Sequence, residues 1–319
     1  MQLGAAERGT LMSHYRATSK ARLSSGVLLA AAAAGAAAAA LGSAGSANAT
    51  CASISGIGNG GGCTSTPTSF ALGIGDGTTA TSNGLFSGAI AAGKNATATN
   101  DGNFNLAVAM GEAAFVQNKG NFNVGVASGL VAAAINTGNG NIGVALGDVS
   151  AAINEGDANL GVAAGKVAAA INKGNLNVGV AVGDVAAAVN TGNANLGFAV
   201  GKVAAAVNTG TGNLAVAIGD PGANPGLKIG PTTVVPAGNV GTFAQTTGVF
   251  NRAFAFGNGS TATANGPLTT IGNNTAITFG NGSNSYAGVI PVVGGTTPNN
   301  QFATALGNAK NAVNGFNNA

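Results

Sequence analysis

The chain has 319 residues, of which 55 are Gly, 45% are hydrophobic and 7% are charged, and it contains no Trp. The low charge and the high apolar content exclude a disordered polyelectrolyte, and the lack of Gly at every third residue excludes collagen. The scarcity of charged residues also argues against a coiled coil. This composition is typical of a thin, repetitive and strand-rich protein.

Residues 1–49 have the pattern of an export signal. Three basic residues precede an uncharged run over 27–42, and a small-x-small pattern ends at Ala49. These features predict a signal peptide that is cleaved after Ala49. A retained transmembrane anchor is the alternative, but the run is rich in Ala and Gly and is shorter than the ~20 apolar residues that a span needs.

Cleavage would leave the rest of the chain electrically neutral. The segment 1–49 holds four of the twelve basic residues and one of the nine acidic residues, which leaves eight of each sign. The neutral remainder has no basic stripe, so we expect no nucleic-acid binding. The only His, His14, lies in the signal, so no His is left for general-base catalysis or for a metal site.

Two Cys residues follow the predicted cleavage site directly. Cys51 and Cys63 lie in the segment 50–65, which is rich in Gly and Ser. Two Cys in an exported chain are expected to pair, and their spacing, with no other ligands near them, excludes a zinc site. We therefore predict a Cys51–Cys63 disulfide that staples a flexible N-terminal segment, and no metal site.

Residues 66–220 form a tandem array with a period of 18 residues. Positions are numbered 1 to 18 from the Gly that opens a typical block, as in GNFNVGVASGLVAAAINT at 120–137. A seventh strong block opens at Gly210 and breaks at Pro221, and two blocks before the strong ones keep the phase weakly. The six complete strong blocks follow one another without a gap at 102–119, 120–137, 138–155, 156–173, 174–191 and 192–209.

Each block contains two short alternating patterns. Apolar residues at positions 5, 7 and often 9 alternate with Gly or Ala, and a second alternation occupies positions 12, 14 and 16. A period of two predicts strands, and Gly at positions 1 and 10 supplies the turns. A helix in the Ala-rich second half is the alternative, but so short a helix is marginal. The sequence predicts an all-β fold, a β-solenoid (β-roll) of 18-residue turns with two short strands per turn, whose narrow core is filled by Val, Leu, Ile and Ala.

Stacked turns place equivalent residues above one another, which predicts ladders along the stack. Asn recurs at positions 4 and 17, where stacked amides can hydrogen-bond along the axis, and position 11 alternates in sign, so that neighbouring turns face opposite charges. The ladder at position 4 is Asn105, Asn123, Asn141, Asn159, Asn177, Asn195 and Asn213. The ladder at position 17 is Asn118, Asn136, Asn154, Asn172, Asn190 and Asn208. The alternating residues are Asp148, Lys166, Asp184, Lys202 and Asp220.

Three further segments follow the array. Residues 221–247 are rich in Pro and Gly and are predicted to form an irregular loop. Residues 248–314 return weakly to the period, with Asn251 at position 4 and Gly257 at position 10, and predict about three further strand pairs that continue the array. Residues 315–319 are predicted to be a frayed tail.

Fragments of the array resemble a known family of repeats. The fragments NTGNGNIG at 136–143, NTGNANLG at 190–197 and NTGTGNLA at 208–215 are similar to the Asn- and Gly-rich repeats of mycobacterial PPE proteins of the major polymorphic tandem repeat type. The Pro-Pro-Glu domain of that family is absent, and the predicted signal stands in its place. The resemblance implies a secreted or surface protein of a mycobacterium or a related actinobacterium.

A second resemblance covers the flanks of the array. The fragments SFALGIGDGTTAT at 69–81, FAFGNGSTATANG at 254–266 and TALGNAKNA at 304–312 are similar to the head repeats of trimeric autotransporter adhesins. The coiled-coil stalk and the membrane strands of that family are not found. This resemblance implies a β-roll and a role in adhesion, without an anchor.

The sequence favours a structural role over catalysis. It contains no G-x-x-x-x-G-K-[ST] phosphate loop and no Asp-rich calcium repeats, so we expect no enzyme, no catalytic residues and no cofactor. We expect an exported structural or surface repeat protein of the cell envelope, secreted or on the cell surface, with adhesion as one such role. The alternative is a secreted soluble module that binds carbohydrate, host protein or ice on a flat solenoid face.

The expected partners follow from these two functional hypotheses, the surface protein and the secreted binding module. They are components of the cell envelope or molecules of a host surface, and further copies of the chain that add to the open strand edges of a solenoid. We expect no nucleic acid as a partner, and no integral membrane span after the signal is cleaved.

Overall fold

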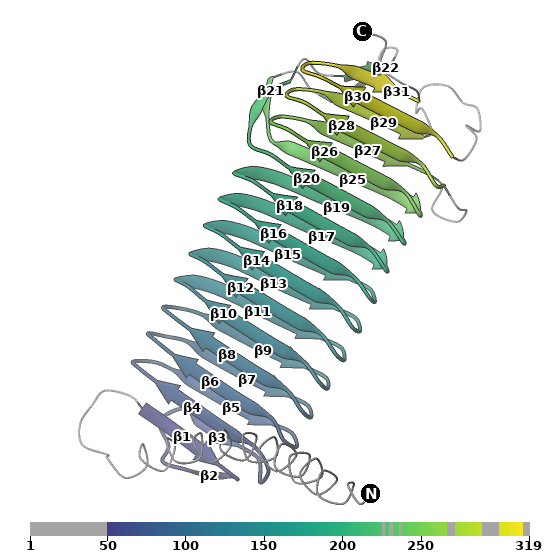
Figure 1. The fold of residues 1–319 in the computed structure, drawn as a ribbon. Coiled ribbons are helices and arrows are strands. Elements are labelled where there is room, and N and C mark those ends of the chain that lie inside the picture. Colours follow the sequence, from purple (N-terminus) through teal and green to yellow (C-terminus); the bar gives the residue numbers. More distant parts are fainter. Residues whose placement is uncertain are drawn as a thin grey trace, which may run out of the picture.

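The structure is an elongated stack of short strands in two sheets that lie back to back (Figure 1). Over the described residues the regular structure is all β, without a helix, which confirms the predicted β-solenoid with two strands per turn. The computed structural model describes residues 50–224, 227–229, 232–235, 238–266, 272–288 and 300–314. The predicted signal 1–49, its cleavage site at Ala49 and the predicted tail 315–319 therefore lie outside the described residues.

The first sheet contains the first strand of each turn. From β4 onward its neighbours are parallel and are offset by one turn, as in the pairing of Val126 with Val144 between β10 and β12. In order along the stack its strands are β2 (Ile57–Gly58), β1 (Thr50–Ile54), β4 (Phe70–Ile74), β6 (Gly88–Ala92), β8 (Leu106–Met110), β10 (Val124–Ser128), β12 (Ile142–Leu146), β14 (Leu160–Ala164), β16 (Val178–Val182), β18 (Leu196–Val200), β20 (Leu214–Ile218), β26 (Arg252–Phe256), β28 (Thr275–Phe279) and β30 (Phe302–Leu306).

The second sheet contains the second strand of each turn and is parallel throughout. Its register also advances by one repeat per turn within the array, as in the pairing of Asn136 with Asn154. In order its strands are β3 (Cys63–Ser65), β5 (Thr79–Asn83), β7 (Thr97–Asp101), β9 (Phe115–Lys119), β11 (Val131–Thr137), β13 (Val149–Glu155), β15 (Val167–Lys173), β17 (Val185–Asn193), β19 (Val203–Thr211), β25 (Thr242–Val249), β27 (Thr261–Asn265), β29 (Asn284–Gly288) and β31 (Asn311–Val313).

The core between the sheets is built from Ala, Gly and Asn. In β12, Gly143 and Ala145 point inward and are buried, whereas Ile142, Val144 and Leu146 point outward. The same pattern holds from β8 to β20, where positions 6 and 8 are buried and positions 5, 7 and 9 are not. The prediction that Val, Leu, Ile and Ala fill the core is therefore confirmed for Ala and wrong for Val, Leu and Ile in these strands, although the period of two on which it rested is confirmed.

The two sheets lie close together, and within the array Val116 of β9 is the one larger aliphatic side chain that is fully buried between them, opposite Gly125. Asn136 reaches across the core from β11, and its Nδ2 donates a hydrogen bond of 2.9 Å to the carbonyl of Val124 in β10. A Cβ atom added to Gly143, in the opposing sheet, would lie 2.8 Å from Asn136 Oδ1. Glycine at position 6 thus makes room for the buried Asn at position 17, and one Asn side chain spans the gap between the sheets.

Both Asn ladders are confirmed, and both are buried. At position 17, Asn154 Nδ2 donates to Asn136 Oδ1 of the preceding turn at 2.8 Å. At position 4, the Asn141 backbone N–H donates to Asn123 Oδ1 at 2.9 Å, and Asn141 Nδ2 donates to the carbonyl of Gly156 in the next turn at 2.6 Å. The ladders run beyond the predicted residues, to Asn100, Thr246, Asn251, Asn274 and Gln301.

Tight turns at positions 1 and 10 connect the sheets. Gly165, at position 10, has a φ of +149°, and a Cβ atom added there would lie 1.7 Å from the carbonyl oxygen of Gly183 in the next turn. Only a residue without a side chain allows this approach between turns. Position 3 also has positive φ but is open, and Ala158 and Leu176 occupy it at φ 55° and 58°.

The N-terminal end of the stack is closed by an antiparallel segment. Strand β1 pairs antiparallel with β4 and with β2, so its direction differs from that of the stacked strands. The predicted disulfide between Cys51 and Cys63 is present and links β1 to β3, which belongs to the other sheet. Its sulfur atoms fill the space beside Gly73, where an added Cβ would lie 2.5 Å from Cys51 Sγ.

The stack continues after the Pro- and Gly-rich segment, as predicted. Strand β25 pairs with β19, and β26 pairs with β20, so the chain rejoins both sheets in register. Since β25 begins at Thr242, the last six residues of the predicted loop 221–247 belong to the stack. The described part of the insertion contains two antiparallel pairs, β21 (Gly222–Asn224) with β24 (Gly238–Val240) and β22 (Leu227–Ile229) with β23 (Thr232–Val235).

Candidate functional site

Titratable groups do not gather in one place over the part of the chain that the structure describes. Within it, no group of three or more His, Cys, Asp or Glu side chains is placed to hold a metal ion, and no helix is long and apolar enough to cross a membrane. Burial raises the pKa of the Tyr286 hydroxyl, and a hydrogen bond with Asn265 partly opposes this shift. Tyr286 is 2% exposed in β29 and is therefore part of the packing near the C-terminal end.

The predicted disulfide residues lie at one end of the stack, and within the described ranges no further His, Cys, Asp or Glu gathers with them into a group of three. Cys51 and Cys63 are 1% and 5% exposed and bonded to each other. Their place at the first turn indicates a structural role, which is to hold the antiparallel segment against the stack.

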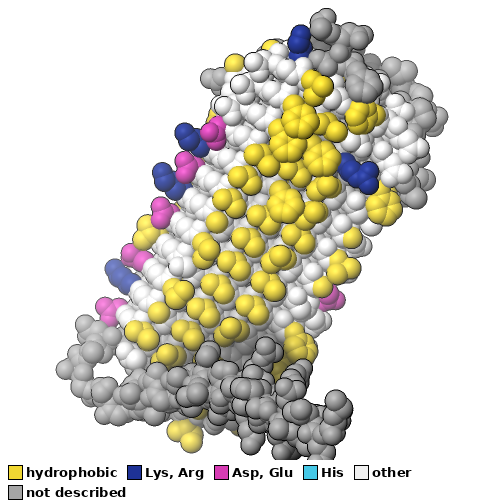
Figure 2. Space-filling view, in the orientation of Figure 1, with side chains coloured by type: hydrophobic (Ala, Val, Ile, Leu, Met, Phe, Trp, Pro, Cys, Tyr) yellow, Lys and Arg dark blue, Asp and Glu magenta, His cyan; other side chains and the backbone are white. Residues whose placement is uncertain are grey.

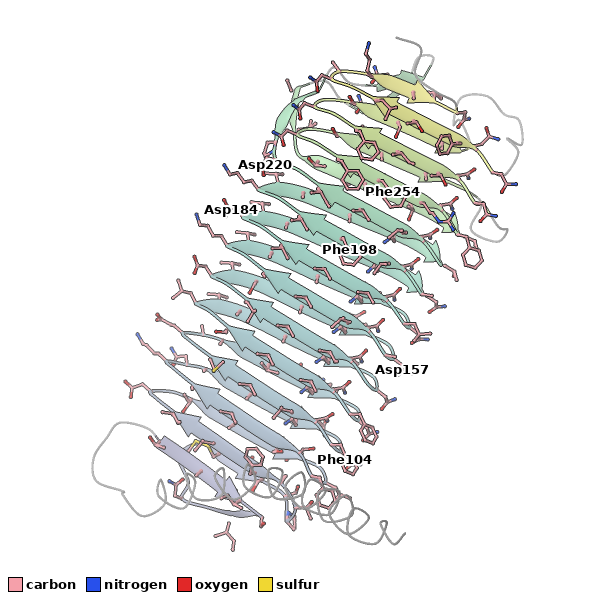
Figure 3. The ribbon with its side chains drawn as sticks, viewed as in Figure 1. Phe104, Asp157, Asp184, Phe198, Asp220 and Phe254 are labelled. Carbon is pink, nitrogen blue, oxygen red and sulfur yellow. A yellow bond between two sulfur atoms is a disulfide. The ribbon has the colours of Figure 1, made fainter. Side chains whose placement is uncertain are left out.

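The alternating charges of position 11 follow one edge of the stack (Figure 3). The backbone N–H of Val149 donates to the carbonyl of Lys166, and that of Val167 donates to the carbonyl of Asp184, so these residues occupy successive turns as predicted. Among the described residues, the ion pairs within 4.0 Å are Lys94–Glu112, at position 11 of two earlier turns, and Lys173–Glu155, at position 18. Neither pair joins two of the five residues from Asp148 to Asp220. Both are exposed, and such pairs contribute only ~0–1 kcal/mol.

Side chains at positions 2 and 3 follow the opposite edge. At position 2, Asn139 Oδ1 accepts a hydrogen bond from the backbone N–H of Asn121 in the preceding turn, and the pattern repeats along the stack. At position 3, the rings of Phe86, Phe104 and Phe122 stack on one another, with centroids 5.5 and 4.9 Å apart. These ladders brace the turns from outside, and neither pattern was singled out from the sequence.

The outer face of the first sheet is a broad apolar surface, which we call the apolar face. It consists of the outward side chains at positions 5, 7 and 9 from β4 to β30. Figure 2 shows the middle and upper part of this face as a continuous hydrophobic band, with charged residues along its edges. Ser128 is the only polar residue in its central part. That central part contains Leu106, Val108, Met110, Val124, Val126, Ser128, Ile142, Val144, Leu146, Leu160, Val162, Ala164, Val178, Val180, Val182, Leu196, Phe198, Val200, Leu214, Val216 and Ile218.

Aromatic side chains extend the apolar face toward the C-terminal end. Phe254 and Phe256 alternate along β26, and the Phe256 ring stacks on Phe279 of β28 with centroids 4.9 Å apart. Phe279 is 47% exposed. Arg252 is the one charged residue at the outward positions between β4 and β30.

The outer face of the second sheet, the second face, is less apolar. From β11 to β19 its outward residues are Val at position 12, Ala at position 14 and Ile or Val at position 16. Its strands end in outward polar or charged residues, among them Lys119, Glu155 and Lys173. The two faces of the stack therefore differ in side-chain size and in charge.

Sequence reasoning missed the apolar face because it assigned those side chains to the core. The spacing of the Asn residues could have shown which side chains point inward. Asn141, Gly143 and Ala145 occupy positions 4, 6 and 8 of one turn and must share a side of the strand. If the Asn ladder is interior, Gly and Ala are interior too, and Val144 points outward.

The chain was compared with protein-family models, with curated proteins and with solved structures, and none of them matches it.

Proposed function

We propose that the chain is an exported, non-enzymatic structural repeat protein of the cell envelope or cell surface, with adhesion as one such role. The observation that carries this proposal is the combination of a regular stack with the apolar face on one side. A stack of near-identical turns is a stiff element in which each turn contacts only its neighbours. An exposed apolar surface of this extent is typical of proteins that bind a partner or assemble.

Export is supported by the sequence pattern of 1–49 and by the Cys51–Cys63 bond. Disulfides persist in oxidising compartments outside the cytoplasm, and this bond closes the first turn of the stack. The repeats that resemble those of mycobacterial PPE proteins and of trimeric autotransporter heads favour a mycobacterial or related producer and a surface location. Components of the envelope or molecules of a host surface are the partners that this location implies.

Localisation is the test of this function. Cells that express the full chain are fractionated and then shaved with protease while intact, and the N-terminus of the recovered protein is read by mass spectrometry. We expect envelope-bound, protease-accessible protein that begins at Thr50. An Ala49→Phe variant should retain residues 1–49, because the residue before the cleavage site must be small, and the neighbouring Asn48→Gln variant should be processed normally. Cytoplasmic protein with residues 1–49 intact would contradict export.

A secreted soluble binding module is the second candidate, and the regular apolar face is the observation that favours it. This candidate predicts processed protein in the medium and none on shaved cells. In that outcome a glycan array and a thermal-hysteresis assay would be the next measurements. Trp, which carbohydrate platforms often use, is absent from the chain.

A further inference from the structure

We propose that the apolar face is the interface of a homodimer, in which the apolar face of one copy packs on the same face of a second copy. This inference concerns how the chain assembles and does not depend on where the protein resides. It rests on the area, the flatness, the charge and the periodicity of the face.

The area of the face matches that of a stable interface. Twelve strands from β4 to β30 lie side by side in the first sheet, which gives a length of ~53 Å at a strand spacing of ~4.8 Å. Strands of five residues are ~16 Å wide at ~3.3 Å per residue. The footprint of ~850 Å² per copy gives ~1,700 Å² for two, within the ~1,200–2,000 Å² of specific protein interfaces.

The shape of the face suits a second copy of itself. The strands of the first sheet keep nearly the same direction along the stack (Figure 1), so the face is flat enough to lie against an identical face. The stacking and the side-chain ladders that stabilise flat sheets of many strands are already supplied inside the stack by the second sheet and by the Asn residues. Two-fold symmetry brings one patch against the identical patch. Two such faces pack ~10 Å apart over their whole length, whereas faces meeting at an angle, as around a three-fold axis, would leave part of each face exposed.

The distribution of charges favours the apolar face over the second face as the interface. It also favours a second copy over partners that are recognised by charge. Arg252, near one end, is the only charged residue at its outward positions, so burial of the central strands desolvates no ion. The second face has Lys119, Glu155 and Lys173 along one edge, and burial of that edge would desolvate Lys119 and the Lys173–Glu155 ion pair, which costs free energy. The apolar face also lacks charges that would recognise a nucleic acid or an acidic peptide.

Periodicity favours a second copy over an unrelated protein. The half-exposed side chains form rows that repeat at every strand, as with Leu196 and Leu214 at position 5 and Val182 and Val200 at position 9. Ridges at a constant spacing of ~4.8 Å interdigitate best with ridges of the same spacing. Another copy of this chain supplies that spacing along the whole face.

Sedimentation equilibrium of the purified full-length gene product tests the proposal, with the processed form identified by its intact mass. We expect twice the monomer mass over protein concentrations of ~1–100 µM, because interfaces of this size have dissociation constants of about micromolar or below. The double variant Val144→Glu and Val180→Glu places charges at the middle column of the apolar face. It should raise the dimer dissociation constant at least ~100-fold, because the buried carboxylates have no partners.

The matched control carries the same charges on the other side of the same two turns. Ala151→Glu and Ala187→Glu lie at the middle column of the second face, and this variant should dimerise like the unaltered chain. Circular dichroism of both variants should show the strand signal of the unaltered protein.

Three outcomes would overturn the proposal. One is an unaltered protein that is monomeric at every concentration. If that monomer sediments with neutral phosphatidylcholine vesicles, the apolar face would be assigned to a lipid surface. Another is a dimer that survives both double variants, which would place its interface elsewhere on the protein. The third is a dimer that survives Val144→Glu and Val180→Glu but dissociates with the Ala151 and Ala187 substitutions.

Discussion

Each buried Asn in the ladder at position 17 satisfies three hydrogen-bonding partners at once. Asn172 Nδ2 donates to Asn154 Oδ1 at 2.8 Å and to the carbonyl of Leu160 at 2.9 Å, and its Oδ1 accepts from Asn190 Nδ2 at 2.8 Å. A buried polar group costs free energy when it is unpaired. The ladder therefore fixes the register of the turns, since a shifted turn would leave several amides without partners.

We expect Asn172→Ala to destabilise the protein by about 3 kcal/mol, because it leaves the carbonyl of Leu160 and the amides of two neighbouring Asn residues unsatisfied. Asn175→Ala, in the adjacent exposed turn, is the matched control and should cost less than about 1 kcal/mol, since water replaces the lost contact with the backbone of Asp157. Urea unfolding of both variants measures the difference. Equal losses of unfolding free energy in the two variants would show that the buried ladder contributes no more stability than an exposed row of amides does.

At the scale of the strand and turn, much of the fold follows from the sequence. Which side of each strand faces the core, however, does not follow from hydrophobicity. The 18-residue period, the two strands per turn and both Asn ladders could be predicted from spacing alone. The usual assumption that large apolar residues are buried placed Val144 inside and left Ala145 unexplained. The structure inverts this because a turn with one strand of five residues, one of seven and tight corners leaves a gap that is filled almost entirely by Ala, Gly, Ser and Asn.

The corners at position 10 should be the least tolerant sites. Gly165→Ala places a Cβ 1.7 Å from a backbone oxygen of the next turn, at a φ of +149°, and we expect a loss of at least ~3 kcal/mol, because strain and a clash with the backbone add. Gly140→Ala should cost under ~1 kcal/mol, because Ala158 and Ala194 hold equivalent positions in other turns. Thermal melting distinguishes the two. A Gly165→Ala protein that melts like the Gly140→Ala protein would contradict the close approach of the turns.

The disulfide should stabilise the first turn and leave the middle of the stack unaffected. It closes a separation of 12 residues, for which loop entropy gives ~3 kcal/mol, or about 100-fold in a local opening equilibrium. We expect the double variant Cys51→Ala and Cys63→Ala to raise hydrogen exchange at β1 and β3 by that factor. Exchange at β16 and β17 is the internal control and should not change. Protection at β1 that survives the loss of the bond would show that pairing with β4 suffices.

At the scale of the whole molecule, each turn is a unit that contacts its neighbours through the same ladders, so a complete turn should be removable. Deletion of 156–173 joins Glu155 to Gly174 in phase and brings Asn190 beside Asn154 in the ladder. Because the stability of such a stack is nearly a sum over turns, we expect a folded protein that is ~4.8 Å shorter. The cost should be small and should include repulsion between Asp148 and Asp184, which become neighbours.

The matched deletion of 156–172 removes one residue fewer and should prevent folding of the following turns. It moves Asn177 from position 4 to position 5, and a slip of one residue exchanges the inner and outer sides of every following strand. Val178 and Val180 would then point into a gap that holds only small side chains. Small-angle scattering and urea unfolding compare the two deletions. A compact, fully cooperative protein from the 17-residue deletion would mean that the stack tolerates large interior side chains, and that the outward phase of Val, Leu and Ile is not imposed by the width of the core.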